Sequence, residues 1–288
     1  MSESPPPSPR YAQVNSEYGA VLATTPPDED GPVWMVNLMR YRDRADYADG
    51  RATDLTGREA DDAYAPIDEL AAVGAEIVFV GDVETQLLGE PQWDRVAVVK
   101  YPTRRSFIEL QSVPGFAEKH AHKDAGMEQT IIIGCRPLPS PGDAASIGPD
   151  WADVPHPPTD EDGPVQVLHV LRFDETEGVD MPGYDGSDMD HMAAYQRGAA
   201  PVALAHGVRI AGWFGVDGTI LGDGRAWDQV RFNTFPSRDA FMAVVFDPAR
   251  LEAQRDHRET AIADTFTLVV RPLIDRLADS VDDGGGDS

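Results

Sequence analysis

Three side chains are the best suited to carry out chemistry. His169 lies inside an apolar run, Arg172 lies near the end of that run, and His257 lies in a polar stretch farther on. Histidine titrates near neutral pH, so either histidine could move a proton during a reaction. An arginine at a strand end could hold a substrate carboxylate or an oxygen that becomes negative. We therefore predict that His169, His257 and Arg172 are catalytic. The alternatives are a hydrogen-bonded core histidine, a histidine at a helix end and a surface ion pair.

A second set of candidates lies at matching places earlier in the chain. Asn37 and Arg40 occupy the positions in residues 33–41 that His169 and Arg172 occupy in residues 165–173. We predict that this earlier set binds substrate, and it comprises Asn37, Arg40, Trp34, Tyr41 and His122. Because asparagine does not titrate and histidine does, the later half is favoured for catalysis.

These matches belong to an internal repeat. The motifs are DEDGPV at 28–33 and 160–165, WDRV at 93–96 and WDQV at 227–230, PTRRSF at 102–107 and PSRDAF at 236–241, and RPL at 136–138 and 271–273. They recur in the same order at a nearly constant offset. This indicates a tandem duplication of a domain-sized unit.

The overall composition excludes several classes of partner. The chain has 288 residues, with 24 Lys and Arg against 50 Asp and Glu, and a formal net charge of −26. Such a surface repels phosphate backbones and anionic lipid, so we expect neither nucleic acid nor a membrane as partner. A single cysteine, Cys135, permits neither an intrachain disulfide nor a cysteine-based zinc site. With no signal-peptide pattern and no apolar span of about 20 residues, we expect a cytoplasmic protein.

Each half reads as β-α-β-β-α-β. In the first half we expect strands at 33–41, 75–89, 94–101 and 129–135, and helices at 56–73, 103–111 and 116–124. In the second we expect strands at 165–173, 208–214, 227–235 and 265–271, and helices at 188–206, 237–245 and 248–257. Thr56 and Glu59 form a capping-box pattern. Composition divides the chain into a flexible tail at 1–22, domains at 23–138 and 163–277, a Pro-rich acidic linker at 139–162, and an acidic disordered tail at 278–288.

This pattern predicts an α+β fold made of two tandem ferredoxin-like units. Each unit has one antiparallel sheet with its helices on one face. The strands are apolar on both faces, so the open face must also be buried. The natural cover is the open face of the other unit, which gives an intramolecular pseudo-dimeric α+β barrel. The chain would then be a monomer of this kind or a homodimer of it.

Several motifs resemble a known family. NLMRY at 37–41, the block from WDRV to YPTRRSF at 93–107, and RPL at 136–138 are similar to the DUF1330 family, a domain of unknown function. The resemblance covers about 31–138 and, more weakly, 163–273. It implies membership of the dimeric α+β barrel superfamily. That superfamily includes cofactor-free monooxygenases, lactone isomerases, polyketide cyclases and haem enzymes, so the resemblance does not imply one activity.

We therefore expect a cofactor-independent enzyme that is monooxygenase-, isomerase- or cyclase-like and acts on an apolar or aromatic small molecule. A non-catalytic small-molecule-binding or structural module is one alternative, and a haem-binding protein is another. We expect no cofactor and no metal. The DMDH sequence at 188–191 resembles a small metal cluster, but acids are common where a helix begins.

Overall fold

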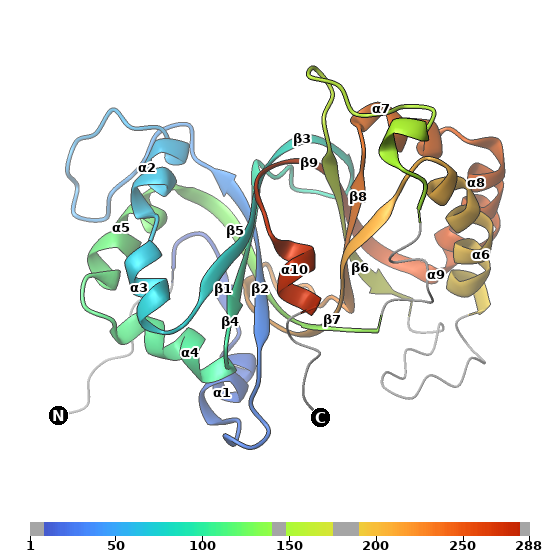
Figure 1. The fold of residues 1–288 in the computed structure, drawn as a ribbon. Helices are drawn as coiled ribbons and strands as arrows, with labels where there is room; N and C mark the ends of the chain where they lie inside the picture. The colour runs from blue at the N-terminus through green and yellow to red at the C-terminus, as the bar shows by residue number, and fades with distance from the viewer. Residues whose placement is uncertain (1–8, 140–147, 175–189, 283–288) are drawn as a thin grey trace.

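The structure is a computed structural model that describes residues 9–139, 148–174 and 190–282 (Figure 1). Unit one contains β2 (Val33–Tyr41), α2 (Gly57–Tyr64), α3 (Ile67–Ala72), β3 (Glu76–Leu88), β4 (Arg95–Tyr101), α4 (Arg104–Glu109), η1 (Leu110–Ser112), α5 (Phe116–Gly126) and β5 (Met127–Pro137). Unit two contains β6 (Val165–Phe173), α6 (Asp190–Ala205), β7 (Arg209–Gly222), β8 (Gln229–Phe235), α7 (Arg238–Val245), α8 (Pro248–Ala253), the π-helical turn η5 (Gln254–Arg258), α9 (Glu259–Ala261) and β9 (Ile262–Asp275). Outside the units lie β1 (Gln13–Val14), α1 (Ser16–Thr24), the 3₁₀ turn η3 (Trp151–Asp153) and α10 (Leu277–Asp282).

Eight strands close into one antiparallel barrel. Their order is β7-β5-β2-β4-β3-β9-β6-β8, and β8 pairs with β7 to complete the circle. The two units meet at the β3–β9 and β5–β7 junctions, and β1 pairs with the outer edge of β7. Figure 1 shows the helices of unit one on one outer side of the barrel and those of unit two on the opposite side. The predicted α+β barrel of two ferredoxin-like units is therefore confirmed.

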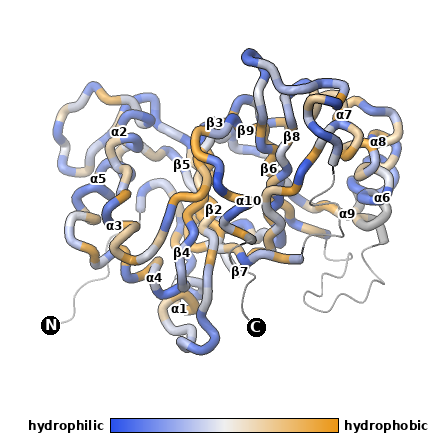
Figure 2. The backbone as a smooth tube through the Cα atoms, in the orientation of Figure 1, coloured by the Kyte–Doolittle hydropathy of each residue, from blue (hydrophilic) through white to orange (hydrophobic). Residues whose placement is uncertain are grey.

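The barrel interior is the main core. Alternate residues of each strand point inward, as in Trp34, Val36 and Leu38 of β2 and Leu168 and Val170 of β6. All five are at most 1% exposed, and phenylalanines from β3, β7, β8 and β9 pack among them. Figure 2 shows hydrophobic stretches running through these central strands. Burying each large side chain contributes about 1.5–3 kcal/mol, so the interior is what joins the two units.

The opposite face of each sheet meets its own helices. In β2 this face carries Val33, Met35 and Met39, which pack in the layers between sheet and helices. Asn37 and His169 share this alternation, so both side chains lie between a sheet and its helices, as the aligned strands predict. The fold therefore places the two candidates at equivalent positions of the two units.

Short-range signals explain where the helices begin and end. The capping box is confirmed: the Thr56 hydroxyl accepts from Glu59 N–H at 3.2 Å, and the Glu59 carboxylate accepts from Thr56 N–H at 2.8 Å. The single helix predicted for 56–73 is wrong in one respect. It is two helices, α2 and α3, separated at Ala65 and Pro66, because proline lacks the N–H that would continue the first helix.

The chain ends are more structured than composition suggests. Residues 11–22 were predicted to belong to a flexible tail, but β1 and α1 form there. The Asn15 side chain caps α1 by accepting two backbone N–H groups, and Tyr18 and Leu22 are buried against unit one. Proline and serine dominate only the first ten residues, so that prediction was extended too far.

The predicted linker and C-terminal tail also need correction. Within the linker, the Trp151 indole N–H donates to the Gly207 carbonyl at 2.8 Å, which ties η3 to unit two. At the C-terminus, α10 places Leu277 and Ser280 against the barrel, and both are buried. Isolated apolar residues such as these anchor segments whose average composition is polar. Within the described ranges, no helix has the length and apolar character needed to span a membrane.

Candidate active-site cavity

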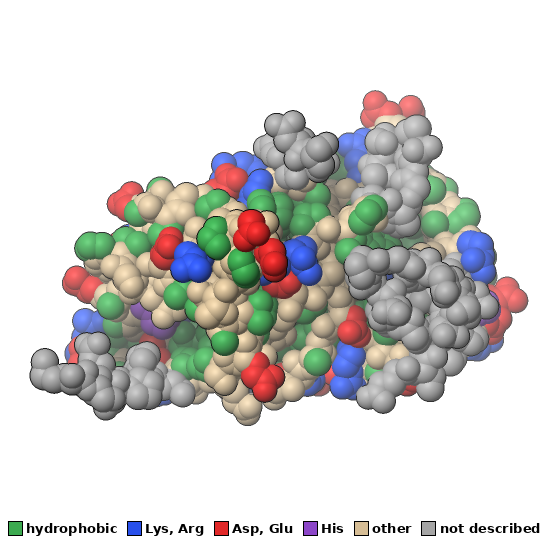
Figure 3. All heavy atoms as spheres, turned by 90° about the horizontal axis from the view of Figure 1, so that it is seen from below, with side chains coloured by type: hydrophobic (Ala, Val, Ile, Leu, Met, Phe, Trp, Pro, Cys, Tyr) green, Lys and Arg blue, Asp and Glu red, His purple; other side chains and the backbone are tan. Residues whose placement is uncertain are grey.

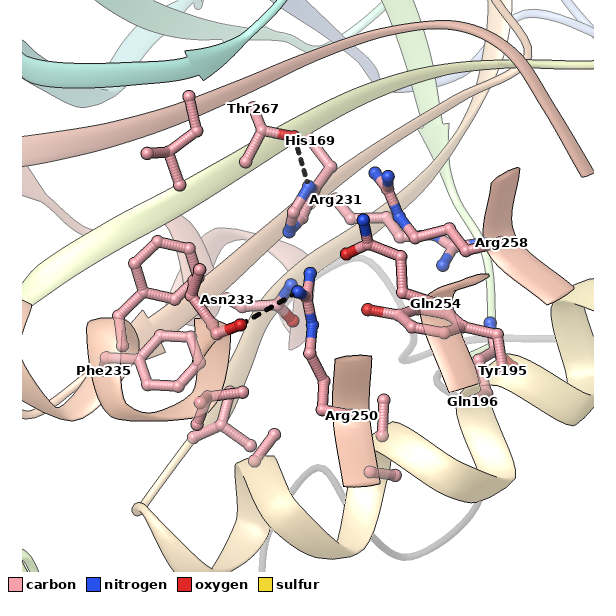
Figure 4. A pocket seen from close by; sticks show the side chains of 18 of the residues that line it. His169, Tyr195, Gln196, Arg231, Asn233, Phe235, Arg250, Gln254, Arg258 and Thr267 are labelled. Carbon is pink, nitrogen blue, oxygen red and sulfur yellow. Dashed lines mark hydrogen bonds between the residues drawn. The ribbon is translucent and has the colours of Figure 1, made fainter. Parts of the chain in front are cut away.

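A cavity of about 800 Å³ lies between the sheet of unit two and its helices. One wall is formed by β6, β8 and β9, and the other by α6, α7, α8 and η5 (Figure 4). Its size is in the range of sites that hold small organic ligands. Most lining residues are apolar, with a few polar groups placed among them.

The sheet wall carries a cluster of four polar side chains. The strand register places His169 of β6 between Arg231 of β8 and Thr267 of β9, and Asn233 lies one step farther along β8 on the same face. A hydrogen bond of 3.2 Å joins His169 Nδ1 and Thr267 Oγ1. Figure 4 shows the second ring nitrogen of His169 pointing into the cavity. Thr267 therefore fixes the ring while leaving one nitrogen available to a ligand.

His169 is held in its neutral form. Burial lowers its pKa well below 6.5, and the nearby Arg258, Arg231 and Arg250 act in the same direction. Its side chain is partly accessible, but the accessible part faces the cavity, so burial still governs its charge. A neutral imidazole near pH 7 can accept a proton or bind a metal centre, whereas an imidazolium cannot.

The helix wall presents two arginines and a tyrosine. Arg258 ends the π-helical turn η5, is 7% exposed, and lies 6.0 Å from the centre of the Tyr195 ring. Arg250 comes from α8, and its guanidinium donates to the Val245 carbonyl at 3.2 Å. Burial lowers the pKa of Arg258, although the guanidinium stays charged at ordinary pH. π-Helical turns often occur at functional sites because they rotate a side chain out of the regular helical position.

Arg231 is held against the sheet by side chains of its own strand and of β7. Its guanidinium lies 3.9 Å from the centre of the Trp213 ring, and its Nε donates to Gln229 Oε1 at 2.9 Å. Stacking and hydrogen bonding together fix the planar group in one orientation. A fixed cation of this kind can stabilise negative charge in a ligand without reorganising.

The rest of the cavity and its mouth are apolar. Phe235 and Phe241 form part of the lining, with ring centres 5.2 Å apart. At the mouth lie Phe246, which is 68% exposed, and Leu88, which comes from β3 of unit one. The cavity therefore offers a polar inner wall and an apolar approach.

Of the predicted catalytic residues, the structure brings only His169 to the cavity. Arg172 is exposed at the end of β6, on the strand face opposite to His169. His257 is half-buried in η5 but does not line the cavity, whereas the adjacent Arg258 does. His122-Lys123 and His257-Arg258 occupy matching places in the repeat, and in both pairs the basic residue is the buried one. Arg231 was missed because polar and apolar residues simply alternate along β8. Such a pattern is ordinary for a strand and does not mark one polar residue as functional.

The predicted substrate-binding residues lie in unit one, away from this cavity. Asn37 donates to the Met35 carbonyl at 2.9 Å, and Trp34 donates to Ser280 at 3.0 Å inside the barrel. Arg40 pairs with Glu128 at 3.1 Å, and Tyr41 donates to Asp61 at 2.7 Å. His122 Nδ1 lies 2.7 Å from the Tyr47 hydroxyl. Each has a partner within the protein. The structure does not gather them into one site.

No metal site is evident in the part of the chain that the structure describes. No group of three or more His, Cys, Asp or Glu side chains there could hold an ion. Asp188 and Met189 of the DMDH motif lie outside the described residues.

Comparison with solved structures finds similarity in sequence to the RPA0582 protein. The RPA0582 protein is 32% identical in one solved structure, which covers 47% of this chain and 100% of that chain, with a TM-score of 0.40. A second structure, of RPA0582 as a protein of unknown function from Rhodopseudomonas palustris, is 30% identical and covers 45% and 98%, with a TM-score of 0.39. This chain belongs to the same family as RPA0582. The share covered corresponds to a single unit.

More distant structures share the barrel along most of the chain. A mutant chlorite dismutase from Candidatus Nitrospira defluvii is 12% identical and covers 86% of this chain and 95% of that chain, with a TM-score of 0.47. A provisionally named monooxygenase from Lactobacillus acidophilus is 9% identical and covers 84% and 94%, with a TM-score of 0.42. Likeness at these identities and TM-scores does not assign an activity to this chain. No protein-family model and no curated protein matches the chain.

Proposed function

We propose that the cavity of unit two is the functional site of a small-molecule enzyme that works without a cofactor on a largely apolar substrate. One observation carries this proposal. The sheet wall of the cavity has the polar residues His169, Arg231, Asn233 and Thr267, whereas the paired positions in unit one are Asn37, Ala97, Val99 and Ile132. A buried polar cluster costs stability unless it serves a ligand or a fixed network. Its restriction to one unit favours function over folding.

The family assignment and the origin of the two units extend this proposal. The motifs at 37–41, 93–107 and 136–138 support membership of the DUF1330 family. The repeated motifs, together with the same order of strands and helices in both units, support a tandem duplication. After such a duplication, one unit can keep a site while the other is kept for packing.

The geometry supports proton abstraction as the chemical step. Neutral His169, oriented by Thr267, would take a proton from an acidic C–H or O–H group of the substrate. Arg231 and Arg258 would stabilise the negative charge that is left on the substrate oxygen. The apolar lining would exclude water and strengthen these interactions.

Hydrogen–deuterium exchange tests this step without knowledge of the full reaction. Benzoylacetone, an enolisable dicarbonyl, is incubated in D₂O with the enzyme, and NMR follows loss of the signal from its central C–H. We expect acceleration by the wild type and a loss of about 10²-fold or more in His169→Asn, which installs the residue of unit one. Arg105→Gln changes an exposed arginine of unit one and is the matched control. Equal exchange rates for wild type and His169→Asn would refute the role of His169.

Haem binding is the second candidate, because the residues present fit that group. The free nitrogen of neutral His169 faces a largely apolar cavity whose arginines could pair with propionates. Bound haem would supply redox chemistry, and His169 would be the residue that holds it. Titration with haemin should then give a Soret band that shifts in His169→Ala. An unchanged free-haemin spectrum would exclude this candidate.

A further inference from the structure

The charge of the cavity is opposite to that of the whole protein. The chain carries a formal net charge of −26, and Figure 3 shows acidic side chains scattered over the face it presents. Among the described residues that line the cavity there is no Asp or Glu, but there are the arginines Arg197, Arg231, Arg250 and Arg258. Buried cations are ordinarily paired with carboxylates. A lining of this kind is suited to an anionic ligand.

Unit one shows where such a carboxylate belongs. Lys123 aligns with Arg258, is buried, and lies 5.3 Å from the Tyr64 ring, just as Arg258 lies over the aligned Tyr195. Burial lowers the pKa of Lys123, and the buried Asp61 acts to raise it. The helix layer of unit one therefore contains a buried carboxylate that favours the charged form of this cation.

Unit two keeps the cation but lacks this carboxylate. Counting from the Tyr64–Tyr195 match, the residue equivalent to Asp61 is Met192, which is buried and lines the cavity. The adjacent Glu259 favours the charged form of Arg258, but among the described residues it does not line the cavity. The internal anion has been replaced by an apolar side chain, and an open cavity lies beside it.

We propose that the unit-two cavity binds an organic anion whose carboxylate takes the place that the Asp61 carboxylate holds in unit one. This inference rests on the proposed functional site and specifies its ligand class. Arg258 and Arg250 bind the carboxylate from the helix wall, and Arg231 approaches from the sheet wall. The apolar tail of the ligand lies along Phe235 and Phe241 and points toward the mouth.

Two further features support convergence of the arginines on one bound group. Arg258, Arg231 and Arg250 all line the cavity, and Figure 4 shows them around the same part of it as the His169 ring. An anion there also lowers the cost of burying Arg258, which is one of the most deeply buried cations of the chain. The volume of about 800 Å³ accepts a ligand with a carboxylate and a short hydrocarbon tail.

Calorimetric titration with octanoate and with octan-1-ol tests the ligand class. The two probes share a tail and differ in the charged head. We expect octanoate to bind the wild type at least tenfold more tightly than octanol, a difference of about 1.4 kcal/mol. Equal affinity for the two probes overturns the proposal, and so does the absence of octanoate binding at about 1 mM, a concentration that corresponds to weak affinity.

Two variants locate the carboxylate. Arg258→Met should weaken octanoate binding at least tenfold and leave octanol binding within about twofold. Met192→Asp restores the carboxylate of unit one and should also weaken octanoate binding. Arg105→Gln, an exposed arginine far from the cavity, should change nothing. Unchanged octanoate affinity in Arg258→Met overturns the proposed placement.

Thermal unfolding tests the same proposal through stability. The unfolding midpoint is measured for the wild type and the variant, with and without octanoate. Without ligand, Arg258→Met should unfold at a higher temperature than the wild type, because it removes a cation whose burial is costly enough to lower its pKa. Added octanoate should raise the midpoint of the wild type and not that of the variant. If Arg258→Met does not fold, Arg250→Met tests the octanoate-dependent rise alone, which should be smaller than in the wild type.

The octanoate experiments and the deuterium-exchange experiment can fail independently of each other. Octanoate binding with the expected variant effects, but without deuterium exchange, would leave an anion-binding site that does not abstract protons. Deuterium exchange that depends on His169, with equal affinity for octanoate and octanol, would leave the reaction and remove the anion.

Discussion

The two units have the same order of elements but use the space between sheet and helices differently. In unit one this layer is packed: Tyr64, Phe116 and His120 contact one another, and the Tyr11 hydroxyl meets His120 at 3.3 Å. In unit two the equivalent layer contains a cavity of about 800 Å³. A barrel of this kind therefore does not by itself create a pocket. Side chains from outside the repeated unit decide whether the layer is packed or hollow.

The N-terminal segment is one cause of this difference. Tyr18 and Leu22 of α1 are buried in the same cluster as Met35 and Ile132, on the helix-facing side of unit one. At the mouth of the unit-two cavity, by contrast, Phe246 is 68% exposed. The N-terminal segment therefore covers part of the helix-facing side of unit one, while the cavity of unit two has an exposed apolar residue in its lining.

The units also differ in how they neutralise charge. In unit one, Arg95 contacts Asp61, Asp62 and Asp82 at 2.8 to 3.5 Å. In unit two the aligned residue is Gln229, which instead accepts a hydrogen bond from Arg231. Arg95 of unit one is thus paired with three carboxylates, whereas among the described residues several arginines and no carboxylate line the cavity of unit two. This second difference is what makes unit two suited to binding.

The largest effect should come from removing a matched aromatic from each unit. Tyr101 and Phe235 are aligned, equally buried, and stack on the aligned Phe107 and Phe241. Tyr101→Ala leaves a hole in a packed layer and should cost about 3–5 kcal/mol of unfolding free energy. Phe235→Ala enlarges a space that already exists, so its cost should be smaller. Chemical denaturation followed by circular dichroism measures both.

Equal losses from these two substitutions would contradict the contrast between packed and hollow layers. Phe246→Ala is the control, because this side chain is mostly exposed and should change stability by less than about 0.5 kcal/mol.

A smaller effect should follow when the internal anion of unit one is neutralised. Asp61 accepts from the Tyr41 hydroxyl at 2.7 Å and acts to raise the pKa of the buried Lys123. Asp61→Asn should cost about 1.5–3 kcal/mol in chemical denaturation, as expected for a buried charged hydrogen bond. The control is Asp62→Asn, which removes a carboxylate that is 54% exposed and should cost less than about 1 kcal/mol. If both variants lose the same stability, burial of Asp61 is not important.

Much of this architecture could be predicted from the sequence, because strand alternation is a local property. The alternation in residues 33–41 and 165–173 places Asn37 and His169 correctly on the helix-facing side. The cavity could not be predicted, because its polar groups come from separate strands and helices. Arg258 reaches the cavity through a π-helical turn, which shifts the side chain relative to regular helical spacing.

The same reason explains the errors at the chain ends. Average composition marks residues 1–22 as a tail, but Asn15, Tyr18 and Leu22 are enough to cap and bury one short helix. Such contacts depend on a partner surface that the local sequence does not contain. Sequence patterns therefore describe the repeated unit better than they describe what covers it.

The contrast between His169 and Asn37 should also appear in the pH dependence of stability. The folded-state pKa of His169 lies below the ordinary 6.5, so the folded protein binds fewer protons than the unfolded chain. Stability should be full above about pH 6.5 and fall as the pH drops toward the folded-state pKa, with a slope approaching about 1.4 kcal/mol per pH unit. His169→Asn should lose this part of the slope, as measured by denaturation between pH 7 and pH 5.

His120→Asn provides the comparison in unit one. Burial also lowers the pKa of His120, but less strongly than that of His169, so its variant should change the slope less. A slope that is the same in wild type and His169→Asn would mean that His169 is not held neutral.

The smallest expected effect concerns the aligned helix caps, which test whether the two units are built by the same local rules. The Thr103 hydroxyl accepts from Ser106 N–H at 3.1 Å at the start of α4, and the Ser237 hydroxyl accepts from Ala240 N–H at 3.0 Å at the start of α7. Replacing either cap by alanine should cost about 1 kcal/mol. Ser237 also donates to the His156 carbonyl at 3.0 Å, which ties the segment before unit two to α7. Ser237→Ala should therefore cost a few tenths of a kcal/mol more than Thr103→Ala, and the reverse order in chemical denaturation would show that this contact does not contribute.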